Sequence, residues 1–298
     1  MYINRSKPKY WSKNIVDKFS LKYYLNIESR VCEGHFNIFD DNGIPLSDYG
    51  GNIGIQYNPV NVCAYALGNL NIYLKVKEKK YLNIFLRMAD WLIENQVIVN
   101  DIGVWYYNFN WKYVKKPWIS SMAQGEALSV LARAFNITND SKYLYSAQKC
   151  LSSFKFDIKD GGITGYIDSK YKIFEEYVSE VETHVLNGFI YSLLGLFDYF
   201  KFTGDIDAKH LFEEGIYTLE NCLNKYDTGY WSKYDLYSNN LASYMYHTLH
   251  IVQLNVLYDI TGNKILENYA DIWSKYQNSY INCIRALFLK VLQKLFKP

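Results

Sequence analysis

The sequence predicts a mainly α-helical protein, an α/α toroid in which about four helical hairpins form an incomplete barrel. One pattern recurs along the chain: an apolar run with helical spacing, a short polar turn, and a second amphipathic run. The turns of the four copies align at Val76, Thr138, Thr203 and Thr261, with a period of roughly 60 residues. A superhelical solenoid of helix pairs is the other architecture that this pattern allows.

The four hairpins share the same local design. In the first, Leu82, Phe85 and Ala89 lie on one face of the second helix. In the last two, Thr203-Gly204-Asp205 and Thr261-Gly262-Asn263 end one helix and cap the next. The hairpins are expected at residues 70–96, 131–154, 195–223 and 254–276.

Three long connections separate the hairpins, at residues 97–120, 155–184 and 224–243. Each runs from an outer helix to the next inner helix, so all three emerge on one face, at the N-terminal ends of the inner helices. Loops of this length in a compact domain are usually functional or disordered, and these are too aromatic for disorder. Unpaired N–H groups at the helix ends favour an anionic ligand there. Alternating aromatic residues in the first loop also predict a small hairpin.

The two ends of the chain differ from the expected helical domain at residues 56–279. Residues 1–55 are a polar and aromatic extension whose turn signals, at residues 40–43 and 50–51, predict a small β-element. Residues 280–298 are expected to form a basic amphipathic helix.

This C-terminal helix has two interpretations. The first packs four apolar side chains against the helical body: Ile284, Leu287, Phe288 and Leu292. The second places the helix on the inner membrane surface as a peripheral contact, with three lysines towards acidic headgroups: Lys290, Lys294 and Lys297.

Composition and charge exclude some classes of function. A net charge of +2 without a basic stripe argues against nucleic-acid binding. An aromatic content of 18%, with 30 Tyr, fits either an A/T-rich genome or a carbohydrate site. Five scattered cysteines predict a reducing compartment and no metal framework. Neither a signal peptide nor a membrane span is evident, so we expect a cytoplasmic protein.

Several side chains in the loops have more than one interpretation. Glu175 and Glu176 are either the acid and base of a glycosidase or charges on a solvated loop. His247 and His250 lie three apart on a helix, but no third ligand follows at metal-site spacing, which favours capping or substrate hydrogen bonding. These residues alone predict an α/α protein with a polar, aromatic cavity.

Three blocks of sequence carry a family resemblance. They read WISSMAQG from Trp118, FEEY from Phe174, VLNGFIYSLLG from Val185, then YDTG, YDL and YHTLHI from Tyr226, Tyr234 and Tyr246. In order and spacing, over about residues 55–278, they resemble the catalytic domain of the D-glucuronyl 5-epimerases (heparosan-N-sulfate-glucuronate 5-epimerases). The resemblance implies an α/α barrel that converts D-glucuronate to L-iduronate within heparosan-type polysaccharides, without a redox cofactor.

The resemblance also implies the residues that act. The catalytic residues would be Glu176, Tyr177, Tyr234 and Tyr246. Inverting carbon 5 removes a proton from one face and returns one to the other, so two groups must flank the sugar. Glu176 or a tyrosine of perturbed pKa would remove the proton, and Tyr246 would deliver one. Substrate binding is expected from Trp118, Gln124, Asn187 and Tyr191.

Three positions depart from the family pattern. Tyr237 stands where an arginine usually follows the YDL triplet, Val178 replaces a proline, and Glu126 replaces a glutamine. The partner of the substrate carboxylate is therefore left open between backbone donors and three side chains: Lys115, Lys233 and His247.

Two other classes of function remain alternatives. One is another α/α enzyme acting on uronic acids, a polysaccharide lyase or an unsaturated glucuronyl hydrolase. The other is a sugar-binding module that has lost turnover. A uronic-acid polysaccharide or oligosaccharide is the expected partner in each case, and a homodimer is left open.

Overall fold

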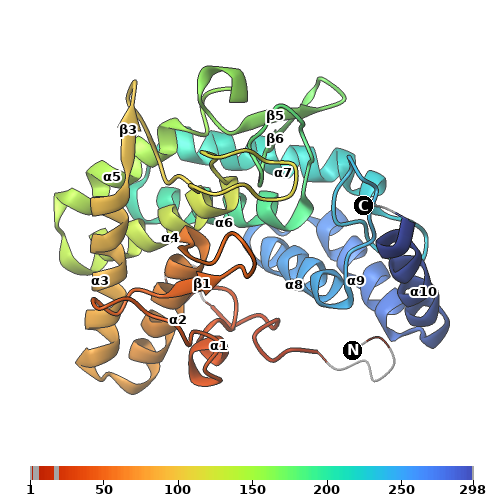
Figure 1. Ribbon diagram of the computed structural model, residues 1–298, viewed down its shortest axis with the longest axis horizontal. Coiled ribbons are helices and arrows are strands. Elements are labelled where there is room, and N and C mark those ends of the chain that lie inside the picture. The colour runs from red at the N-terminus through yellow and green to blue at the C-terminus, as the bar shows by residue number, and fades with distance from the viewer. Residues whose placement is uncertain (1, 3–6, 17–19, 297–298) are drawn as a thin grey trace.

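The computed structural model describes residues 2, 7–16 and 20–296, and it confirms the predicted incomplete barrel of helical hairpins (Figure 1). The inner helices are α2 (Pro59–Val76), α4 (Ser121–Thr138), α6 (Leu186–Thr203) and α8 (Tyr244–Thr261). The outer helices are α3 (Lys79–Asn95), α5 (Ser141–Ser152), α7 (Ile206–Tyr226) and α9 (Lys264–Asn278). Each inner helix ends at one of the four predicted turn positions.

Local chemistry explains why the hairpin turns are so tight. The residue after each inner helix takes a left-handed conformation, which Gly204 and Gly262 adopt without steric cost. In three of the turns, a side chain then accepts a hydrogen bond from the first backbone N–H groups of the outer helix: Asp140, Asp205 and Asn263. These caps stop one helix and start the next within a few residues.

The long loops carry short antiparallel pairs (Figure 1). Strands β3 (Val97–Val99) and β4 (Ile102–Val104) begin the first loop, and single bridges from Tyr107 to Trp118 and from Trp111 to Val114 extend it as the predicted aromatic hairpin. The second loop holds a 3-10 turn, η1 (Ile158–Asp160), followed by β5 (Thr164–Ile167) and β6 (Tyr171–Phe174).

The N-terminal extension contains the expected β-element and a helix that the sequence did not predict. Strands β1 (Leu46–Asp48) and β2 (Ile55–Tyr57) pair, and α1 (Glu28–Cys32) precedes them. Before α1, the backbone N–H of Tyr23 donates to Asn71 in α2, and the Tyr24 hydroxyl donates to Asp198 in α6, at 2.8 and 2.7 Å. Lys13 pairs with Asp259 in α8. The extension therefore bridges the first and last inner helices.

The C-terminal helix α10 (Tyr280–Phe296) packs at the end of the molecule, next to α9 (Figure 1). Ile284 and Phe288 were predicted to pack on the helical body under the first interpretation, yet they are among the exposed apolar residues. The fully buried Cys283 and Ala286 occupy the inner face instead. None of the described helices combines the length and apolar character needed to cross a membrane.

Helices α4 and α6 approach each other more closely than side chains would permit. A Cβ on Gly195 would lie 2.0 Å from the carbonyl oxygen of Gly125, and a Cβ on Gly125 would lie 2.5 Å from the Cα of Ser192. Both obstacles are backbone atoms, so neither can rotate away. The Arg133–Asp198 ion pair, 2.5 Å long and fully buried, joins the same two helices further along.

We expect Gly195→Ala to destabilise the protein by about 1–3 kcal/mol or more, because the added methyl group forces α4 and α6 apart. Gly215→Ala in α7 is the matched control, since its Cβ would meet a terminal methyl of Leu193, which can rotate, and alanine favours the helix. Urea denaturation of both variants checks this. Equal urea midpoints for the two variants would show that the α4–α6 interface can accommodate a methyl group at Gly195.

Candidate active site

The three long loops and α10 enclose a pocket of about 530 Å³. The first loop contributes Lys112 and Tyr113, and the second contributes Tyr177. The third loop and α10 supply the rest of the lining: Tyr234, Asp235, Tyr237, Ser238, Asn240, Lys290 and Gln293. The expectation that all three loops meet on one face is confirmed.

Glu176 adjoins this pocket through its contact with Tyr234, which lines it, and is only 7% exposed. Its carboxylate accepts a hydrogen bond from the Asn187 side chain at 3.1 Å and from the Tyr234 hydroxyl at 3.4 Å. Burial raises the pKa of Glu176 to about 7, against the opposing effects of Tyr177 and Lys112. A carboxylate with this pKa suits a general base near neutral pH.

Three tyrosines surround this carboxylate. The hydroxyls of Tyr177 and Tyr234 lie 3.5 Å apart, and the Tyr234 ring meets the Tyr246 ring edge-on at 5.0 Å. Burial and then the Glu176 charge raise the pKa of all three, to about 12 for Tyr246 and well above 10 for the others. Each tyrosine is therefore a neutral hydroxyl at physiological pH, able to donate a proton but not to remove one.

Two cations lie near the cluster, and sequence reasoning singled out neither. Lys112 lines the pocket, and its Nζ lies 5.8 Å from the centre of the Tyr177 ring. Arg30 comes from α1, where it contacts Asn61 of α2 and stacks on Phe36. The Arg30 charge opposes the rise in the pKa of Tyr246. Lys112 follows an aromatic residue in the loop and Arg30 belongs to the extension, so neither stands inside a recognisable motif.

Glu126 is a second buried carboxyl group near the site. It lies on α4, is 1% exposed, and its Oε2 atom has no hydrogen-bond partner among the described residues. Burial raises the pKa of Glu126 to about 8, which the Arg30 charge opposes and the Glu176 charge reinforces. Glu126 is therefore mostly protonated at neutral pH, and a neutral glutamic acid has the size and shape of the glutamine expected at this position.

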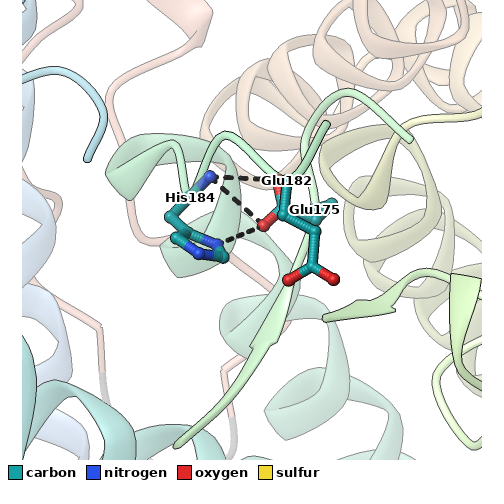
Figure 2. A group of neighbouring side chains, drawn as sticks. All are labelled: Glu175, Glu182 and His184. Carbon is teal, nitrogen blue, oxygen red and sulfur yellow. Dashed lines mark hydrogen bonds and ion pairs between the residues drawn. The ribbon is translucent and has the colours of Figure 1, made fainter. Parts of the chain in front are cut away.

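Glu175 holds the loop that carries Glu176. Its fully buried carboxylate accepts the backbone N–H groups of Thr183 and His184, each at 3.0 Å, and pairs with Nδ1 of His184 at 2.5 Å. Figure 2 shows His184 turned towards Glu175, with Glu182 beside them. His184 has a left-handed φ of 54°, which these bonds stabilise. Glu175 and Glu176 are both buried, so neither is a charge on a solvated loop.

The same three side chains, Glu175, Glu182 and His184, lie close enough to share a metal ion. However, the oxygens of Glu175 already accept these loop donors, and Glu182 accepts the backbone N–H of Tyr166. Burial alone would lower the pKa of His184, but its hydrogen bond to Glu175 and the Glu175 charge raise it overall. The raised pKa favours the protonated ring, which donates rather than binds a metal, and the carboxylates already accept loop donors, so we assign this group to loop positioning.

The family follows from comparison with known proteins. Residues 99–275 match the family model described as D-glucuronyl C5-epimerase C-terminus, which spans more than half of the chain. The chain belongs to the D-glucuronyl C5-epimerase family. The D-glucuronyl C5-epimerase of Caenorhabditis elegans is 36% identical over 235 residues, covering 70% of this chain. This chain spans only 38% of the length of that epimerase.

Other relatives extend the comparison of sequence and fold. An uncharacterised protein of Methanocaldococcus jannaschii is 31% identical over 295 residues, covering 91% of this chain and 92% of its own length. A GH76 α-mannanase of Bacteroides thetaiotaomicron superposes with a TM-score of 0.54 at 13% identity, over 83% of this chain and 64% of the mannanase. The unsaturated glucuronyl hydrolase of Bacillus sp. GL1 superposes with a TM-score of 0.51 at 15% identity, over 75% of this chain and 62% of the hydrolase. These two structures show that the epimerase-family chain has the α/α toroid fold.

Three of the expected substrate-binding residues adjoin the catalytic candidates. Asn187 bonds Glu176, as described above, and the Trp118 ring lies 5.7 Å from the Tyr177 ring while its indole N–H donates to the Phe109 carbonyl. Burial in α6 raises the pKa of Tyr191 well above 10, and the charges of Glu126 and Glu176 add to this effect. Asn187 and Trp118 therefore contact the catalytic candidates directly, and Tyr191 interacts with Glu176 electrostatically.

None of the seven expected substrate-binding residues lines the main pocket, and the other four lie elsewhere. Gln124 donates to the Gly103 carbonyl and the Ser153 hydroxyl in the core, and His247 bonds Ser232 and the Trp273 carbonyl. Both are fully buried with their polar atoms engaged. Lys115 borders a neighbouring pocket, and Lys233 donates to the Asn239 side chain.

Replacing Glu175, which anchors the loop that carries Glu176, should destabilise the protein. We expect Glu175→Gln to lower the free energy of unfolding by about 1.5–3 kcal/mol, because the amide cannot accept from every donor that the charged group satisfies. Glu182→Gln is the matched control, because Glu182 is exposed and a glutamine oxygen can still accept from Tyr166. Chemical denaturation measures the free energy of unfolding of both variants. A value for Glu175→Gln equal to that of the unaltered protein would contradict the anchoring role.

Proposed function

We propose that this protein inverts carbon 5 of D-glucuronate residues within a polysaccharide, giving L-iduronate. The observation that carries the proposal is the buried Glu176 carboxylate, whose pKa of about 7 suits a base, in contact with tyrosine hydroxyls that stay protonated. The names of the family and of the nematode relative support the same reaction.

The reaction requires two proton transfers on opposite faces of the sugar. Glu176 takes the proton from carbon 5, and the electron pair of that C–H bond moves into the sugar carboxylate to form an enediolate. Tyr246 then gives its hydroxyl proton to the other face of carbon 5, where the returning electron pair forms the new C–H bond. Solvent reprotonates the tyrosinate and receives the proton from Glu176. Tyr246 suits this role because Arg30 opposes the rise in its pKa.

Tyr177 and Tyr234 position the sugar and donate to its developing negative charge. Preorganised donors of this kind stabilise an enediolate more effectively than water does. Lys112 is the proposed partner of the substrate carboxylate, because it is a cation on the pocket wall beside Tyr177. Tyr237 lines the same pocket and is 61% exposed, so its ring offers a stacking surface for a neighbouring sugar.

Deuterium exchange tests the proposed reaction directly. Incubated in heavy water with heparosan, N-sulfated heparosan or another glucuronate polymer, the protein should place deuterium at carbon 5 and yield inverted uronate, both visible by NMR. The exchange rate should rise with pH through about 7 and then level, because Glu176 must be deprotonated.

Two variants separate the roles in this assay. Glu176→Gln should lower exchange by about 10²–10⁴-fold, as expected for loss of a general base. Tyr246→Phe should retain more exchange than inversion, because Glu176 can still remove a proton from carbon 5 and return a deuteron to the same face. An unsaturated product that absorbs ultraviolet light would instead identify a lyase, and binding of a polymer without any exchange would identify a sugar-binding module.

The assignment of Lys112 has its own prediction. Lys112→Gln should lower kcat/KM by about 10- to 100-fold, because a hydrogen bond to a charged group contributes about 1.5–3 kcal/mol. Lys233→Gln is the matched control on the third loop, where the ammonium group is held by Asn239. Steady-state kinetics on one polymer compare the two. Equal losses, or a loss only in the Lys233 variant, would reject Lys112 as the carboxylate partner.

A further inference from the structure

Helix α10 presents a continuous apolar stripe to the outside of the protein. Its members, with their exposed fractions, are Ile281 (77%), Ile284 (47%), Phe288 (62%), Val291 (48%) and Leu295 (71%). Their spacing alternates between three and four residues, which puts all five on one face of the helix. Scattered apolar residues are normal on a protein surface, but an ordered row of five needs a partner.

The fold of the described residues does not use this stripe, because the opposite face of α10 does the packing. Cys283 and Ala286 are fully buried in a cluster with Trp231 and Leu241. Lys290, which the sequence placed towards lipid headgroups, instead donates its ammonium group to the Leu241 carbonyl at 2.5 Å. Helix α10 is therefore firmly held while its apolar face remains outward.

Charge distinguishes between the occupants that such a stripe would accept. Residues 280–298 contain four basic residues and no acidic residue, and of these the side chain of Lys294 and all of Lys297 lie outside the described structure. A second copy docked through the same stripe would bring two basic helices together without the opposite charges that stabilise helix pairs. A bilayer with anionic headgroups supplies both an apolar layer for the stripe and the opposite charge.

We propose that α10 docks this protein on the surface of a bilayer that carries anionic headgroups, with its apolar stripe at the boundary between headgroups and acyl chains. The helix lies in the plane of the interface and does not cross it. Lys290 and Gln293 of the same helix line the main pocket, so docking holds the rim of that pocket beside the membrane. This surface contact does not depend on the reaction proposed above.

Vesicle sedimentation tests the proposal with the full chain. We expect binding to vesicles of mixed phosphatidylcholine and phosphatidylglycerol, weaker binding at high ionic strength, and little binding to phosphatidylcholine alone. Combining Ile281→Ser with Phe288→Ser should weaken binding by about tenfold or more, because both side chains lose their transfer into the apolar layer. These residues are exposed, so the variant should fold normally, which circular dichroism verifies.

The matched control combines Ile55→Ser with Ile206→Ser, two exposed apolar residues (54% and 56%) away from α10. It should bind the mixed vesicles as the unaltered protein does. Failure to bind the mixed vesicles, or equal binding by both double variants, would overturn the proposal. A dimer in light scattering that the Ile281 and Phe288 changes dissociate would overturn it in favour of a second copy.

Discussion

The close approach of α4 and α6 is the constraint on which the site depends. Gly125 and Gly195 allow the two backbones to meet, and the same helices position the loop before α6. The Ser121 hydroxyl and backbone N–H of α4 donate to the carbonyls of Phe174 and Glu175, while Gly188 of α6 leaves room for the Glu176 side chain. A wider separation of α4 and α6 would therefore displace the proposed base as well as the core.

Burial is the main electrostatic effect in this site. It raises the pKa of Glu176, Glu126 and the surrounding tyrosines alike, because each ionised form loses contact with water. Its consequences differ with the chemistry of each group. A carboxylate whose pKa approaches 7 becomes a stronger base, whereas a tyrosine whose pKa rises to about 12 or beyond remains a neutral donor. One low-dielectric environment thus accounts for both partners in the proposed two-sided proton transfer.

The two ends of the chain contact the inner helices and the pocket from outside the four hairpins. The N-terminal extension bridges α2, α6 and α8 and brings Arg30 close to Tyr246. Helix α10 contributes Lys290 and Gln293 to the pocket wall. The pocket wall therefore depends on α10, a segment outside the four hairpins, as well as on the long loops.

The sequence by itself determined the hairpins, their turns and the face on which the long loops meet. Periodic apolar residues and turns such as Thr203-Gly204-Asp205 act over a few neighbouring residues, so a local pattern is sufficient to predict them. It also indicated Glu176 and the three tyrosines through the motifs that contain them. Only the tertiary structure decided that Gln124 and His247 lie in the core, that Lys112 lines the pocket, and that Glu175 anchors the loop. Those outcomes depend on contacts between segments distant in sequence, and on burial, which no local pattern records.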